Sequence, residues 1–143
     1  MKRLLIALAA VVALAGPVAA QDKPNLVTVL SAEHPQTQLM AMVLTMQSVQ
    51  QGVQARVLLC GPAGDLALKD APAAATAPQE PKGMSPQGLM RKIMETGTSV
   101  EVCAIYLPNK GVGADALLDG VGQAEPPAMA GHLLADNTRI LSF

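Results

Sequence analysis

Ser99-Val-Glu-Val-Cys-Ala-Ile-Tyr-Leu107 is an apolar run that predicts a buried β-strand, and it carries Cys103. The chain has one other cysteine, Cys60, which closes a second such run, Ala55-Arg-Val-Leu-Leu-Cys60. Continuous apolar strands are typical of a parallel sheet that is covered on both faces. Open α/β sheets bind ligands and react at the carboxyl edge of their strands, so both thiols are candidate functional groups. A thiol at that edge can be a nucleophile or a sulfur carrier, whereas a thiol in mid-strand is usually core filler.

The rest of the chain alternates between predicted strands and predicted helices. Further strands are expected at 25–31 and 139–143. Helices are expected after His34-Pro35 up to a stop at Gly52, after Ser85-Pro86 up to Gly97, and from Pro126-Pro127 through Leu134. The segment 70–83 has no apolar periodicity and is expected to be a mobile loop. This alternation predicts an α/β protein with a mostly parallel sheet of about five strands and helices on both faces.

Residues 1–20 have the pattern of a secretory signal peptide. A basic pair, Lys2 and Arg3, precedes an apolar stretch at 4–15, and small residues at 18–20 form a cleavage site. The apolar stretch is too short to anchor a stable membrane span. We therefore expect export to the periplasm, no membrane attachment after cleavage, and a single domain at 21–143.

Charge and aromatic content narrow the partner classes. From residue 21 on, eight basic side chains stand against eleven acidic ones, a formal charge of −3. This balance gives no electrostatic footprint for nucleic acid. Tyr106 and Phe143 are the only aromatic residues, so stacking platforms for bases or sugars are effectively absent. The core must consequently be built from aliphatic side chains and methionine.

Three segments carry a family resemblance. They are Val100-Glu-Val-Cys103-Ala, Leu117-Leu-Asp-Gly-Val121 and the terminal Leu134-Ala-Asp-Asn-Thr-Arg-Ile-Leu-Ser-Phe143. In this order, after an exported start, they resemble the DsrE/DsrF-like family of small sulfur-relay proteins. The resemblance covers the whole mature chain and implies a three-layer, flavodoxin-like fold assembled as a homo-oligomer, a trimer or hexamer. It also implies that Cys103 carries a persulfide and passes sulfur to a partner, although relay members are typically cytoplasmic and fold does not settle function.

A reactive Cys103 needs partial exposure and neighbours that favour the thiolate. Lys110 follows the predicted strand and can supply positive charge. His34 follows the first strand, and with that strand central in the sheet it would end beside Cys103. The competing interpretation is that Cys103 is a small buried hydrophobe.

Export adds a disulfide between Cys60 and Cys103 as an alternative, because exported chains commonly oxidise their thiols. Such a bond would stabilise the fold by roughly 4 kcal/mol on the chain-entropy model. In the expected strand order, however, the first strand separates the two cysteine strands and places their axes about 9.6 Å apart. A disulfide needs Cα atoms within about 7 Å, so this order disfavours a simple bridge.

Metal and cofactor sites have weak signals. His34 and His132 are far apart in sequence, so a zinc site is not indicated, and a soft-metal site of Cys60, Cys103 and His34 is a minor alternative. Met42 and Met46 lie on the apolar stripe of the first helix, where core packing explains them better than copper binding. The Gly111-Val-Gly113 turn lacks the spacing of a phosphate-binding loop. We expect no cofactor and no resident metal.

The sequence therefore predicts a sulfur carrier that uses Cys103, supported by Cys60, His34 and Lys110, with an unidentified sulfur donor or acceptor protein. Two alternatives stay open. One is a non-catalytic oligomeric binding module with structural or incidental cysteines, and the other is a soft-metal or thiol-redox sensor.

Overall fold

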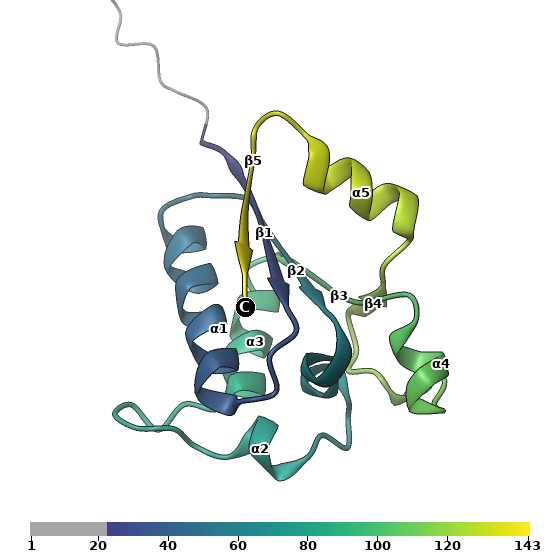
Figure 1. Ribbon diagram of the computed structural model, residues 1–143. Coiled ribbons are helices and arrows are strands. Elements are labelled where there is room, and N and C mark those ends of the chain that lie inside the picture. The colour runs from purple at the N-terminus through teal and green to yellow at the C-terminus, as the bar shows by residue number, and fades with distance from the viewer. Residues whose placement is uncertain (1–22) are drawn as a thin grey trace, which may run out of the picture.

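The computed structural model describes residues 23–143, which form one five-stranded sheet flanked by helices (Figure 1). The strands are β1 (Asn25–Leu30), β2 (Ala55–Leu59), β3 (Ser99–Val102), β4 (Val121–Gln123) and β5 (Thr138–Ser142). The helices are α1 (Pro35–Gln50), α2 (Ala73–Thr76), α3 (Pro86–Met94), α4 (Tyr106–Lys110) and α5 (Pro126–Leu134), with 3₁₀ helices η1 (Gly61–Ala67) and η2 (Ala114–Ala116). The predicted signal peptide lies outside the described residues. Within them, no helix is both long and apolar enough to cross a membrane.

All neighbouring strands are parallel, and their order is β4-β3-β2-β1-β5. From β1 to β3 the chain steps in one direction across the sheet, and α1 and α3 cover the same face. The connection from β4 to β5 steps back past β1, and its helix α5 lies on the opposite face (Figure 1). Right-handed crossovers produce this arrangement, because reversing the step reverses the face that the helix covers. The result is the predicted three-layer α/β architecture of the flavodoxin-like kind.

The main core lies between the sheet and the α1/α3 layer. Its fully buried apolar side chains are aliphatic or methionine, among them Leu30, Met42, Leu59, Met90, Ile93 and Val102. The burial of Met42 agrees with the core-packing interpretation of the methionines. Both helices begin as predicted: His34 and Ser85 cap them by accepting a hydrogen bond from Gln36 N and Gly88 N, and a proline follows each cap.

The opposite face of the sheet carries a smaller cluster. Val27, Leu58, Ala124 and Met129 are buried there, and both cysteines pack against them. Met129 is the one buried residue of α5, so this helix forms a thin cover compared with α1 and α3.

The structure corrects three expectations. The first strand does not lie between the cysteine strands, because β2 pairs directly with β3. The predicted strand 99–107 ends at Val102, and its second half turns into α4. The segment 70–83 contains α2, whose Ala75 is buried against the main core; its mobility stays a prediction.

Candidate thiol–disulfide site

Cys60 and Cys103 form a disulfide at the carboxyl edge of the sheet. In the β2–β3 register Leu59 lies opposite Val102, so the next residue on each strand is a cysteine. Their Cα atoms are 5.1 Å apart, inside the range that a disulfide requires. The alternation of side chains along both strands directs the sulfurs to the α5 face.

The expected strand order, which disfavoured this bond, was therefore wrong. That order placed β1 between the two cysteine strands, which would set their axes at twice the ordinary spacing. In the observed order the strands are neighbours, and parallel neighbours lie about 4.8 Å apart. Adjacent strands with cysteines in register meet the distance requirement without any distortion of the loops.

Backbone hydrogen bonds hold both cysteines in the sheet independently of their sulfurs. Cys60 N donates to Leu30 O at 2.9 Å, and Cys103 N donates to Leu59 O at 2.8 Å. The chain then leaves the sheet at once. After Cys60 it turns at Gly61, whose φ of +53° lies in the left-handed region that glycine favours. After Cys103 it enters α4, and Tyr106 N donates to Cys103 O at 2.8 Å.

Both cysteines are half-buried, so neither is inert filler deep in the core. Cys60 packs against the smaller cluster alone, whereas Cys103 packs against both clusters. Ile105, two residues after Cys103, has 72% of its side chain exposed. The disulfide therefore packs on an apolar floor, and an exposed apolar residue follows Cys103 closely in the chain.

The structure does not place His34 beside the sulfurs. It is exposed at the start of α1, where its Nδ1 accepts the capping hydrogen bond from Gln36 N at 3.3 Å. It follows β1, and β2 separates β1 from the Cys103 strand. His34 thus lies at the predicted edge of the sheet but one strand farther from Cys103 than expected.

Lys110 forms an ion pair with Asp65 rather than with a sulfur. Its Nζ donates to Asp65 Oδ1 at 2.7 Å, and the hydroxyl of Tyr106 donates to the same oxygen at 2.6 Å. Burial of the phenol raises the pKa of Tyr106 above its ordinary value, and the hydrogen bond to Asp65 and its negative charge add to this rise. Asp65 lies in η1, directly after the Cys60 strand, so this cluster connects the segments that follow the two cysteines.

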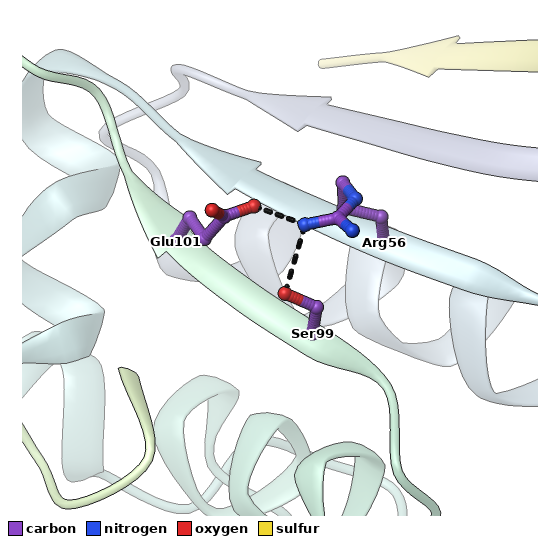
Figure 2. Close-up of polar contacts among 3 residues, drawn as sticks. All are labelled: Arg56, Ser99 and Glu101. Atoms are coloured by element: carbon purple, nitrogen blue, oxygen red, sulfur yellow. Dashed lines mark hydrogen bonds and ion pairs between the residues drawn. The ribbon is translucent and has the colours of Figure 1, made fainter. Parts of the chain in front are cut away.

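A second polar group lies on the same face of the sheet, nearer the amino ends of the strands. Arg56 on β2 donates to Glu101 and to Ser99 Oγ on β3, the latter at 2.9 Å (Figure 2). The side chains of Arg56 and Glu101 are 27% and 20% exposed, so the pair is largely shielded. The sequence contained the signal for it, because Arg56 and Glu101 are the charged residues within the two apolar cysteine runs.

Among residues 23–143, no group of three or more His, Cys, Asp and Glu side chains is arranged to hold a metal ion. His34 also lies apart from the cysteine pair. The bond present at this edge of the sheet is the disulfide of Cys60 and Cys103.

Comparison with known proteins bears on the fold. No protein-family model matches the chain, and no curated protein matches its sequence. Among solved structures, the ychN protein from E. coli superposes with a TM-score of 0.67 and 18% identity, covering 84% of this chain and 99% of that one. MTH1491 from Methanobacterium thermoautotrophicum, described as a protein of unknown function, gives a TM-score of 0.60 and 12% identity, covering 83% and 99%.

The fold and the site define a class: a three-layer α/β protein with a cysteine pair at the carboxyl edge of a parallel sheet. The chain shares its fold, over nearly their full length, with ychN and MTH1491. The three-layer fold that the DsrE/DsrF-like resemblance implied is thereby confirmed.

Proposed function

We propose that this chain is an exported, DsrE-like sulfur carrier in which Cys103 holds a persulfide and Cys60 is the partner thiol. The observation that supports it best is the placement of both cysteines in register on β2 and β3, at the reactive edge of the sheet. The shared fold with ychN and MTH1491 is consistent with the family, and the pattern of residues 1–20 supports the periplasm.

The chemistry requires the reduced protein. The thiolate of Cys103 attacks the outer sulfur of a donor persulfide, a new S–S bond forms, and the donor leaves as a thiolate. An acceptor can then take the outer sulfur. Without an acceptor, the Cys60 thiolate attacks the inner sulfur of the Cys103 persulfide and hydrosulfide leaves. That step oxidises the two cysteines to the observed disulfide and reduces the outer sulfur to sulfide.

Cys60 therefore sets how long the sulfur stays on the carrier. With Cα atoms 5.1 Å apart, its sulfur is within reach of Cys103 without movement of either strand. The exposed Ile105 gives a partner protein an apolar contact two residues from the carrier sulfur. His34 is a supporting candidate at the same edge of the sheet, although β2 separates its strand from that of Cys103, and Lys110 acts on the site through its ion pair with Asp65.

The test uses three forms of the mature chain, each reduced, freed of reductant and incubated with a persulfide donor. Intact mass should show a gain of about 32 Da, one sulfur atom, that persists in Cys60→Ser. The same gain should be transient in the wild type, which returns to the disulfide and releases sulfide. Cys103→Ser should show no gain. A Cys60→Ser protein that takes up no sulfur contradicts the carrier function.

A second candidate is a binding module in which the disulfide is purely structural. The observation that favours it is the disulfide itself, which fastens η1 to α4. In that case both cysteines should resist reduction by glutathione at millimolar concentration in the folded protein. Ready and reversible reduction, followed by alkylation at both residues, would exclude this candidate.

We also propose that the chain assembles as a homo-oligomer, a trimer or hexamer. Helix α1 contains no charged residue, and Met40 and Leu44 on its outer side are 51% and 40% exposed. Exposed apolar surface of this kind is typical of subunit interfaces. Sedimentation of the wild type should give an oligomer, and Met40→Glu with Leu44→Glu should shift it to the monomer. A monomeric wild type would contradict the assembly.

A further inference from the structure

The segments that follow the two cysteines are tied together a second time, by a cluster of Asp65, Tyr106 and Lys110. Asp65 lies five residues after Cys60, in η1, and the other two lie in α4, three and seven residues after Cys103. Asp65 Oδ1 accepts hydrogen bonds from Tyr106 Oη at 2.6 Å and from Lys110 Nζ at 2.7 Å. The disulfide and the cluster thus link the same two segments.

The hydrogen bond between Tyr106 and Asp65 is partly shielded from water, whereas Lys110 reaches it from the surface. Tyr106 is only 7% exposed, and the side chains of Asp65 and Lys110 are 25% and 42% exposed. Hydrogen bonds to a charged group are stronger than neutral ones, and shielding from solvent strengthens them further. Lys110 neutralises the carboxylate that the tyrosine hydroxyl binds.

Gly64 allows the close approach on which the cluster depends. A Cβ atom at this position would lie 2.3 Å from two ring carbons of Tyr106, closer than such atoms come in proteins. The ring therefore packs directly on the backbone of η1. This contact holds Tyr106 in place whether or not the sulfurs are bonded.

The disulfide and the cluster stabilise each other, because both link η1 to α4. Forming either link orders these two segments, so the other link then forms at a lower entropic cost. When the disulfide is reduced, the backbone hydrogen bonds of the sheet still hold both cysteines, and the cluster adds a side-chain link between η1 and α4 that keeps the two thiols close together. The effective concentration of one thiol at the other is then high, which favours disulfide formation.

We propose that Asp65, Tyr106 and Lys110 are positioning residues that set the dithiol–disulfide equilibrium of Cys60 and Cys103. They act on the cysteines through η1 and α4 and do not touch the sulfurs. The proposal deepens the proposed carrier function, because the same equilibrium decides how readily Cys60 discharges a persulfide on Cys103.

The test measures the fraction of disulfide in glutathione buffers of varied ratio, with trapping of free thiols by alkylation. Tyr106→Phe keeps the ring on Gly64 and removes the hydroxyl, whereas Asp65→Asn removes the shared charge. Each should lower the equilibrium constant for disulfide formation about threefold to tenfold, which corresponds to a rise in potential of about 14 to 30 mV.

Thr45→Ala is the matched control. It removes the buried hydrogen bond between Thr28 and Thr45 on the α1 face, so it weakens the fold without touching η1 or α4. Its equilibrium constant should equal that of the wild type. Values within twofold of the wild type for both Tyr106→Phe and Asp65→Asn would overturn the proposal, and so would an equal shift in Thr45→Ala.

The outcome is independent of the carrier function, since no sulfur donor is present. A shifted equilibrium in a protein that takes up no sulfur leaves the positioning role standing and removes the carrier role. Sulfur uptake together with an unchanged dithiol–disulfide equilibrium in the variants leaves the carrier role standing and removes the positioning role. If Asp65→Asn fails to fold, as judged by circular dichroism, Tyr106→Phe decides alone.

Discussion

Loss of the Cys60–Cys103 bond should lower the free energy of unfolding by about 4 kcal/mol. The bond joins residues that are 43 positions apart. On the chain-entropy model, a cross-link across a loop of this length removes about 13 cal/mol/K from the unfolded chain, which is about 4 kcal/mol at 25 °C. Native domains are stable by only about 5–15 kcal/mol in total, so the effect is large. The reduced protein should still fold, because backbone hydrogen bonds hold both cysteines in the sheet.

Urea unfolding of the oxidised wild type and of the Cys60→Ala/Cys103→Ala double variant measures this difference. The double variant should also have the steeper dependence on urea, because its unfolded chain is less compact. Adding reductant should destabilise the wild type and leave the double variant unchanged. A difference below about 1 kcal/mol would refute the assumption that the cross-link mainly restrains the unfolded chain.

Four further predictions concern single residues, two of them Tyr106. Tyr106 is the only tyrosine and the chain has no tryptophan, so near-ultraviolet absorbance follows the ionisation of this residue alone. In the folded wild type, the titration should show no ionisation at the ordinary tyrosine pKa of about 10. In Asp65→Asn, Tyr106 should ionise at a lower pH than in the wild type. Because the pKa of Tyr106 is raised in the folded protein, the free energy of unfolding should fall as pH rises above about 10, where only the unfolded chain loses this proton. Urea unfolding midpoints measured across that pH range test this direction. A rise in stability with pH would contradict it. Gly64→Ala should cost about 1–3 kcal/mol in urea unfolding, whereas Gly131→Ala, in α5 with open space around it, should be neutral or stabilising. Met42→Ala should cost about 2–5 kcal/mol in the same assay, because its fully buried side chain would leave a cavity; a loss below 1 kcal/mol would mean that the α1 layer collapses to fill it.

The sequence predicted those features of the fold that depend on local pattern. Proline after a capping residue located the starts of α1 and α3, and the prolines at 126 and 127 located α5. The apolar runs located β1, β2 and β5 to within a residue or two. These signals are local because capping and periodic burial involve neighbours in the chain.

Strand order was not accessible in the same way. The apolar runs at 55–60 and 99–107 show that both strands are buried, but burial does not say which strand lies beside which. The error about β1 carried over to the site: it separated the cysteines that are in fact bonded and brought His34 too close to Cys103. The sequence could name candidate site residues, but the distances between them depended on topology.

The end of the third strand was missed for a different reason. Apolar residues continue through Leu107, and a short apolar run does not distinguish a strand from a buried helical turn. Tyr106 and Leu107 are buried as residues of helix α4 and not of a strand. Nor did the sequence near Lys110 indicate its partner, because Asp65 lies 45 residues earlier and meets it only through the pairing of β2 with β3.

The unequal cover of the two faces of the sheet has a consequence for local opening. Proteins open segment by segment, and elements with few buried contacts open at a lower free energy than the whole fold. Helix α5 buries Met129 alone, over the cluster that packs against both sulfurs. Its amide protons should therefore exchange with solvent sooner than those of α1. A small thiol that attacks the disulfide would then need only this local opening, while the main core on the other side of the sheet stays closed.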